Sequence, residues 1–197
     1  MEFAFFVSGV GGQGVQLMCK VMALAATAEN RYAMLSSDYG GQMRGGSSLG
    51  TVVVGNAQLR ALPVVPKAGS AIALHHLYWE LTAPKLRPNS LVVVEASMAE
   101  DLKKKEGHPM EGHRIITVPA IKLAADIGNP MTMGLIMLGA YNAITGLVAL
   151  ENLIDAMKEL VPSYRRQHIE TNERALRIGA DNAPAGAARI NLDEVAA

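Results

Sequence analysis

The chain has 197 residues, half of them hydrophobic, and its 18 lysine and arginine residues balance 18 aspartate and glutamate residues. This length and apolar content are enough for one domain with a sizeable core. Because duplex nucleic acid requires a basic face, the balanced charge gives no support for nucleic acid as the main partner. With Cys19 as its single cysteine, the chain alone can form neither an internal disulfide nor the ligand set of an iron–sulfur cluster.

The N-terminal segment predicts a buried strand, a glycine-rich loop and a helix. Apolar residues 3–7 are typical of the strand, and residues 15–28 show the spacing of the helix. The loop between them, Gly9-Val10-Gly11-Gly12-Gln13-Gly14, satisfies the dinucleotide fingerprint G-x-G-x-x-G. Glycine amides beside a helix N-terminus favour a phosphate, but the same glycines also suit close packing of the helix on the sheet. Gln13 is a candidate ligand contact or, alternatively, a cap of the helix.

A second glycine-rich loop follows a short strand expected at residues 33–37. It reads Tyr39-Gly40-Gly41-Gln42-Met43-Arg44-Gly45-Gly46. A guanidinium between glycines has room for bidentate bonds to phosphate or carboxylate, so Arg44 is a candidate binding residue, with an inter-subunit salt bridge as the alternative. Tyr39 can bond a ligand or stabilise the turn. Gly45 and Gly46 clear the space around the arginine.

The rest of the chain alternates predicted strands with predicted helices. Strands are expected at residues 48–55, 71–74, 90–95 and 114–118, and helices at residues 76–81, 98–106, 120–127, 130–150, 150–160 and 167–178. This alternation predicts an α/β fold with a Rossmann-like, mostly parallel sheet flanked by helices and a helical C-terminal third. We expect one domain over residues 1–178 and a flexible tail over residues 179–197, where periodicity is weak.

Residues 130–150 carry no charge, and their length approaches that of a membrane-spanning helix. Glycines and polar residues dilute this segment and no basic cluster flanks it, so we expect a helix buried in a core or an interface, including one for self-association. The start of the chain lacks a basic region typical of a secretory signal, which favours a cytoplasmic location. His75 and His76 are adjacent and have no evident third ligand, so no metal site is expected.

The two glycine loops and several later motifs resemble the gamma subunit of 2-oxoacid:ferredoxin (acceptor) oxidoreductases, the pyruvate/ketoisovalerate oxidoreductase catalytic-domain family. The later motifs are Val118-Pro119-Ala120, Gly128-Asn129-Pro130, Met137-Leu138-Gly139-Ala140, Thr145-Gly146-Leu147-Val148 and Val161-Pro162. The resemblance covers residues 3 to about 178.

This resemblance implies a supporting subunit with no catalytic residue of its own. In such enzymes thiamine diphosphate, magnesium and iron–sulfur clusters are held by alpha, beta and ferredoxin-like subunits, and ferredoxin accepts the electrons. Coenzyme A takes the acyl group, and the gamma subunit lies on the coenzyme A side of the site. The residues that the resemblance points to for this side, or for a partner subunit, are Gly9, Gly11, Gly12, Gln13, Gly14, Tyr39, Arg44, Gly45 and Gly46.

One departure from the family leaves the substrate open among pyruvate, 2-oxoglutarate, ketoisovalerate and related 2-oxoacids. Many gamma subunits look like Y-G-P-E-x-R-G-G at the second loop, whereas this chain has Gly41 and Gln42 in place of the proline and glutamate. Indolepyruvate-type members are similar in lacking that pair.

Two other classes of function stay open. A free-standing Rossmann-type nucleotide-binding oxidoreductase needs an acidic residue roughly 20 residues beyond the loop to hold a ribose. Glu29 is near that position, but it ends the predicted helix and does not end a second strand, so the fingerprint is incomplete. The third class is a purely structural assembly subunit without a ligand.

Overall fold

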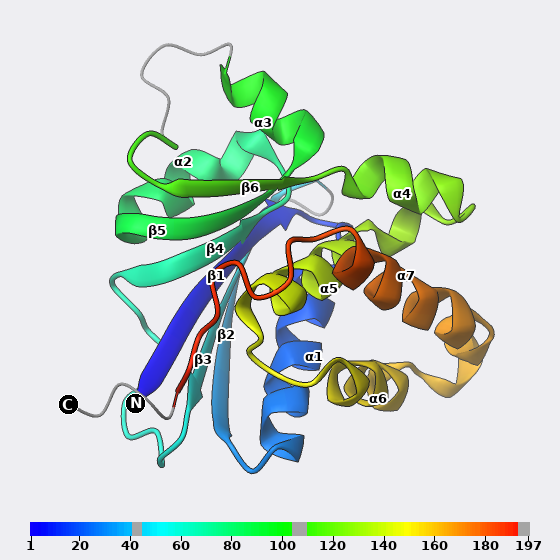
Figure 1. The fold of residues 1–197 in the computed structure, drawn as a ribbon, viewed down its shortest axis with the longest axis horizontal. Coiled ribbons are helices and arrows are strands. Elements are labelled where there is room, and N and C mark those ends of the chain that lie inside the picture. The colour runs from blue at the N-terminus through cyan, green and yellow to red at the C-terminus, as the bar shows by residue number, and fades with distance from the viewer. Residues whose placement is uncertain (41–44, 104–109, 193–197) are drawn as a thin grey trace.

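The computed structural model describes residues 1–40, 45–103 and 110–192, and its strands form one sheet (Figure 1). The order across the sheet is β2-β3-β1-β4-β5-β6. The strands are β1 (Glu2–Val10), β2 (Tyr32–Tyr39), β3 (Ser47–Gly55), β4 (Ala68–Ala73), β5 (Leu86–Glu95) and β6 (Arg114–Val118).

Strand β3 is the one strand of this sheet that runs against its neighbours. It pairs antiparallel with both β1 and β2, whereas β1, β4, β5 and β6 pair parallel in succession. A parallel connection needs a crossover of roughly a dozen residues, and the segment between β2 and β3 is too short for one. The predicted mostly parallel α/β sheet is confirmed, with β3 as a hairpin partner that separates β1 from β2.

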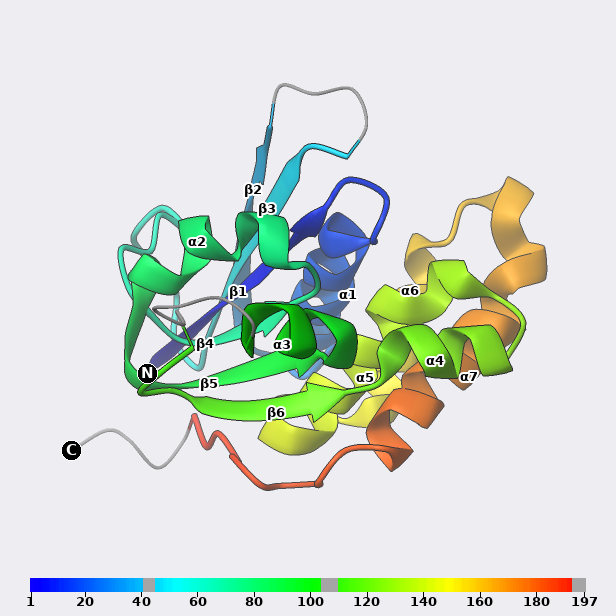
Figure 2. The ribbon, with the colours of Figure 1, turned by 90° about the horizontal axis from the view of Figure 1, so that it is seen from above.

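Helices cover both faces of the sheet, as Figure 2 shows. They are α1 (Val15–Ala28), α2 (Trp79–Thr82), α3 (Ala96–Lys103), α4 (Ala120–Asp126), α5 (Met133–Thr145), α6 (Leu150–Leu160) and α7 (Ile169–Asp181), with 3-10 turns at His76–Tyr78, Ala83–Lys85, Pro130–Thr132 and Ser163–His168. The uncharged segment is shorter than predicted as a helix, because α5 ends at Gly146 in the left-handed region, with φ of 60°. Among the described residues, no helix is both long enough and apolar enough to cross a membrane.

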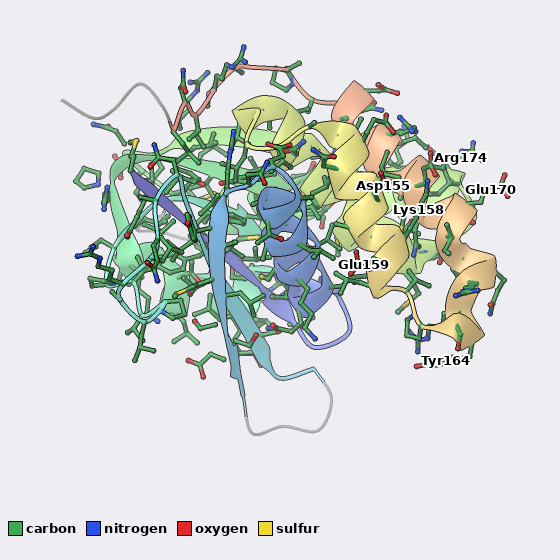
Figure 3. All side chains as sticks on the ribbon, turned by 90° about the horizontal axis from the view of Figure 1, so that it is seen from below. Asp155, Lys158, Glu159, Tyr164, Glu170 and Arg174 are labelled. Atoms are coloured by element: carbon green, nitrogen blue, oxygen red, sulfur yellow. The ribbon has the colours of Figure 1, made fainter. Side chains whose placement is uncertain are left out.

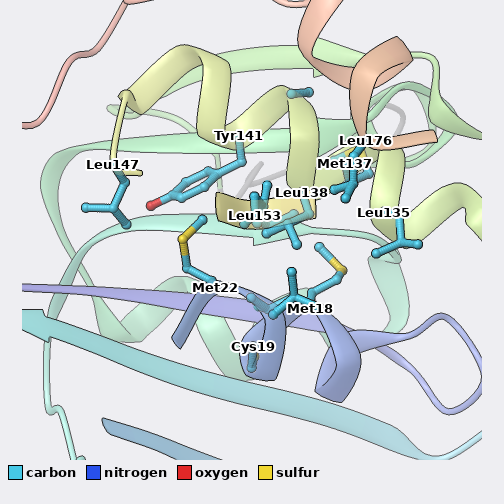
Figure 4. Close-up of a cluster of buried hydrophobic side chains, with 14 of the residues drawn as sticks. Met18, Cys19, Met22, Leu135, Met137, Leu138, Tyr141, Leu147, Leu153 and Leu176 are labelled. Carbon is cyan, nitrogen blue, oxygen red and sulfur yellow. The ribbon is translucent and has the colours of Figure 1, made fainter. Parts of the chain in front are cut away.

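The larger core lies between the sheet and helices α1, α5, α6 and α7. Alternate residues along each strand supply it, so Phe5 and Val7 face this side while Phe6 faces α2 and α3. Figure 4 shows methionines of α1 facing the leucines and Tyr141 of α5. The Tyr141 hydroxyl is hydrogen-bonded to Ser70, and burial raises the pKa of this tyrosine above its usual value.

Helices α5 and α7 cross at very short range because both carry a glycine at the contact. A Cβ added at Gly139 would lie 2.1 Å from the Leu176 carbonyl oxygen, and one at Gly179 would lie 2.0 Å from the Ile136 oxygen. Neither position can hold a side chain without moving backbone. The motif Met137-Leu138-Gly139-Ala140 is therefore a packing motif.

The chain remains packed beyond the boundary expected at residue 178, which lies inside α7. Backbone amides of Gly186, Ala188 and Ile190 donate to the carbonyls of residues 143, 144 and 145 at the end of α5. Leu192 is only 1% exposed. The last carbonyls of a helix have no partner within it, so an extended segment can bind there through its backbone, without any periodic pattern of side chains.

Candidate functional site

The loop after β1 delivers the N-terminus of α1 without a side-chain cap. Gly12 and Gly14 adopt positive φ angles of 103° and 80°, which side chains rarely tolerate, and Gly14 is the N-cap. Glycine has no side chain that could accept hydrogen bonds from the first amides of α1, and the first turn contains no acidic residue. The first amides of α1 therefore have no partner from a cap, and with the positive end of the helix dipole they favour binding of an external anion.

Gln13 braces this loop from within. Its Oε1 accepts a hydrogen bond from the Val10 amide at 2.9 Å. A Cβ added at Gly9 would lie 2.6 Å from the same oxygen, so glycine at this position makes room for the brace. The loop also lies against α5, where a Cβ on Gly134 would approach the Gln13 carbonyl oxygen to 2.5 Å. The Gln13 side chain therefore bonds within the loop and does not cap α1, and its contact with a ligand stays a prediction.

The described end of the second glycine loop contacts the first. The Gly11 amide donates to the Gly46 carbonyl at 2.9 Å, and the Tyr78 hydroxyl donates to the Gly45 carbonyl at 3.1 Å. Gly45 has a φ of 70°. Tyr39 ends β2, next to this loop, while Arg44 lies outside the described residues. The structure thus brings the loops together at the carboxyl end of β1.

A groove of about 720 Å³ opens beside the first loop. Gly11, Gly12 and Gly14 line one wall together with the first turn of α1. The opposite wall comes from the segment between α6 and α7, with Arg165 and His168. Asn129 and Asn172 add amide groups, and none of the described residues that line the groove carries a carboxylate. The groove therefore combines a helix N-terminus with a guanidinium, an arrangement suited to phosphate or carboxylate.

No role is predicted from the sequence for Arg165 or His168, which form the wall between α6 and α7. The available signal was the basic run that follows the helix stop at Pro162. Salt bridges from α6 to α7 hold this wall, with Lys158 bonded to Glu173 at 2.7 Å and Arg177 to Glu151 at 2.7 Å. In Figure 3, Lys158 projects from α6 toward α7, and Tyr164 marks the turn that leads to Arg165.

The Glu29 side chain has a structural role. Its Oε1 accepts from the Ala149 amide at 2.5 Å and from the Asn152 side-chain amide at 2.9 Å. Glu29 therefore lies at the end of α1 and binds the start of α6. It does not lie at the end of a strand, where a carboxylate that binds a ribose would be expected. This arrangement argues against a complete dinucleotide site.

The paired histidines also have local partners. His75 Nδ1 accepts from the Leu77 amide at 3.2 Å, and burial lowers the pKa of His75. His76 Nδ1 lies 3.4 Å from an Asp101 oxygen. Within residues 1–40, 45–103 and 110–192 there is no group of three or more potential ligands that could hold a metal ion.

The family model for pyruvate ferredoxin/flavodoxin oxidoreductase matches residues 4–182. The chain is 31% identical to ketoisovalerate oxidoreductase subunit VorA of Methanothermobacter marburgensis over 89% of its own length, and it spans 35% of that relative. It is 27% identical to 2-oxoglutarate synthase subunit KorC of Methanocaldococcus jannaschii, over 79% of this chain and 82% of KorC.

Solved structures share the fold. The gamma subunit of a keto/oxoacid ferredoxin oxidoreductase from Geobacter sulfurreducens matches with a TM-score of 0.75 and 24% identity, over 92% of this chain and 98% of that one. The 2-oxoglutarate:ferredoxin oxidoreductase of Magnetococcus marinus, solved with 2-oxoglutarate, coenzyme A and succinyl-CoA, matches with a TM-score of 0.75 and 15% identity, over 97% of this chain and 34% of that one. The resemblance noted from the glycine loops is confirmed, and the chain belongs to the pyruvate ferredoxin/flavodoxin oxidoreductase family.

Proposed function

We propose that this chain is the gamma subunit of a thiamine diphosphate-dependent 2-oxoacid:ferredoxin oxidoreductase. It supports, within a hetero-oligomer, the oxidative decarboxylation of a 2-oxoacid to acyl-CoA. Its membership of the family and its match to KorC, over 79% of this chain and 82% of KorC, support this assignment. The proposal places thiamine diphosphate, magnesium and iron–sulfur clusters on alpha, beta and ferredoxin-like partners, ferredoxin as the acceptor and the complex in the cytoplasm.

Within that complex, the groove beside the first glycine loop contributes to the coenzyme A side of the active site. The observation that carries this role is the uncapped N-terminus of α1, which lines a groove shared with Arg165 and His168. Coenzyme A carries several phosphate oxygens, and backbone amides with a guanidinium are their usual partners. Gly9, Gln13, Gly45 and Gly46 shape the loop, while direct contacts from Gly11, Gly12, Gly14, Tyr39 and Arg44 belong to the same proposal.

Arg165 provides the sharpest test, because the neighbouring Arg166 is also exposed but does not line the groove. Charged hydrogen bonds contribute roughly 1.5–3 kcal/mol, so Arg165→Ala should raise the KM for coenzyme A at least tenfold. The KM for the 2-oxoacid should stay unchanged in the reconstituted hetero-oligomer. Arg166→Ala is the matched control and should leave both constants near those of the unaltered complex.

The purely structural alternative makes a different prediction in the same assay. If the complex assembles with Arg165→Ala and Arg44→Ala and its KM for coenzyme A is unchanged, the coenzyme A role is refuted and an assembly role stands. A chain that oxidises its substrate alone, with no partner subunits, would refute the gamma-subunit assignment itself.

A further inference from the structure

Strands β2 and β6 form the two edges of the sheet (Figure 2) and differ in how they are protected against pairing with a further strand. At one edge, β6 has five residues, begins at Arg114 and is followed by Pro119. At the other edge, β2 has eight residues, contains neither proline nor lysine, and keeps an unbroken register with β3. Short strands, charges, prolines and bulges keep an exposed edge from pairing. Strand β2 has one such feature, Asp38 near its end.

The outer edge of β2 presents a row of unpaired backbone groups. The Gly40 amide donates to the Ser47 carbonyl at 2.8 Å, so the even-numbered residues of β2 are the ones hydrogen-bonded to β3. The amides and carbonyls of Ala33, Leu35 and Ser37 therefore point away from the sheet. Within the described part of the chain, β2 pairs with β3 alone, and these outward groups have no other backbone partner. Such a row is a template for one more strand.

Two large apolar side chains are exposed beside this edge. The Ser36 hydroxyl donates to the Pro63 carbonyl at 3.2 Å, so the loop between β3 and β4 lies against the middle of β2. Leu62 and Val64, on either side of Pro63, are 80% and 78% exposed, the largest fractions among the exposed hydrophobic residues of the described chain. Exposed apolar surface that adjoins an unpaired strand edge favours a protein partner.

We propose that β2 pairs with β2 of a second copy of this chain, antiparallel and about a two-fold axis at Leu35. The outward groups of both strands must meet, so odd-numbered residues pair with odd-numbered residues, and a centre at Leu35 or at Ser36 gives the most overlap. The centre at Leu35 places Asp38 opposite Tyr32 of the second copy, whose hydroxyl can donate to the carboxylate. The centre at Ser36 places the same carboxylate opposite Met34. Charge complementarity therefore selects Leu35.

This register also separates the like charges and brings the apolar side chains together. The two Asp38 carboxylates lie at opposite ends of the paired strands, about 20 Å apart, so they do not repel each other. Ser36 lies one residue from the axis, so the loops bonded to it meet there, and Leu62 and Val64 of one copy cover those of the other. A contact of this isologous kind forms a closed dimer. The pairing does not depend on the groove or on the gamma-subunit assignment.

Sedimentation equilibrium of the full chain tests the pairing, and we expect a reversible dimer. Tyr32→Glu places a carboxylate opposite Asp38 at both ends of the paired strands, whereas Tyr32→Lys removes the same ring and places an ammonium there. The Tyr32→Lys dimer should therefore be tighter than the Tyr32→Glu dimer by about fivefold. Thr117→Glu, at an exposed position of the other edge strand, is the control and should leave the dissociation constant unchanged. A chain that stays monomeric, or equal dissociation constants for the two Tyr32 variants, overturns the proposal.

Two further substitutions test the strand contact and the loop contact separately. The Ser37 amide points away from β3, so Ser37→Pro keeps the ladder within the chain and removes a donor that the dimer needs. We expect this variant to be folded by circular dichroism and to be monomeric. Leu62→Ser should weaken the dimer, whereas Ile121→Ser removes an exposed apolar side chain on α4 and should not. A folded Ser37→Pro chain that dimerises as before, or equal effects of Leu62→Ser and Ile121→Ser, overturns the inference.

Discussion

The glycines of the loop after β1 and those of the α5–α7 crossing meet different physical requirements. Gly12 and Gly14 have positive φ angles and open space around the position of a Cβ, so they are needed for their backbone conformation. Gly139 and Gly179 have no positive φ, but a Cβ at either would overlap a carbonyl oxygen. One residue type thus serves an exposed loop and a buried helix contact, and substitutions should separate the two uses.

The largest effect is expected at the helix crossing. Gly139→Ala places a methyl group 2.1 Å from the Leu176 carbonyl oxygen, so the backbone of α7 must move. We expect the free energy of unfolding to fall by about 3 kcal/mol, measured by urea denaturation. Gly69→Ala in β4 is the matched control, because nothing lies within 4 Å of its Cβ position. Equal stability of the two variants would contradict the requirement for close approach.

A smaller effect is expected where the obstructing atom belongs to a side chain. A Cβ added at Gly50 would lie 2.2 Å from Cys19 Sγ, with its next neighbours at 3.6 Å. Gly50→Ala should therefore cost about 2 kcal/mol. In Cys19→Ala the clashing sulfur is absent, so the double variant should be more stable than the sum of the two single effects predicts. Additive losses in this double-mutant cycle would show that the obstruction lies elsewhere.

At the loop, the cost should depend on backbone conformation and not on side-chain size. Gly14 lies in the left-handed region, with φ of 80° and ψ of 16°. Gly14→Ala should reduce the free energy of unfolding by about 1 kcal/mol, and Gly14→Asn by less, because asparagine tolerates this region better. Chemical denaturation of both variants measures the difference. A greater loss for asparagine would point to crowding and remove the contrast with the crossing.

The smallest effect at neutral pH concerns the thiol beneath Gly50. Burial raises the pKa of Cys19 from 9.0 to about 12, so the folded state favours the neutral thiol. Below pH 9 the thiol is neutral in both the folded and the unfolded state, so its burial contributes fully to the free energy of unfolding. As the pH rises from 9 toward 12, the free energy of unfolding decreases by about 1.4 kcal/mol per pH unit, because the thiol ionises in the unfolded state only. Unfolding free energies at pH 8 and pH 10 should therefore differ more for the unaltered chain than for Cys19→Ala. The same pH dependence in both chains would assign it to other groups.

Much of the local structure could be predicted because it depends on neighbouring residues. Helices Val15–Ala28 and Leu150–Leu160 and strand Arg114–Val118 have the predicted bounds, since each shows a clear pattern and has a glycine or proline within two residues of one of its two ends. The hydrogen bond between Gly11 and Gly46 joins the two glycine loops, which the sequence shows only as separate motifs. The reversal of β3 was not predicted, because an apolar run has the same composition in either direction.

Only one wall of the candidate site, the glycine loop, could be predicted from the sequence. The glycine loop has a recognisable spacing, whereas Arg165 and His168 lie about 150 residues further along. They reach the groove only because α6 packs beside α1 and α7 packs on α5 and α6.

The sequence by itself determined the strand–loop–helix unit, the two glycine loops, the α/β class and the family, because each depends on local spacing and residue type. Only the tertiary structure decided which glycines are required for a positive φ and which for the close approach of two helices. It also decided which residues, distant in the sequence, complete the groove. The physical reason is that the periodicity of apolar residues determines whether a segment forms a helix or a strand and which of its faces is buried. The distance between two segments depends instead on how every layer of the molecule packs.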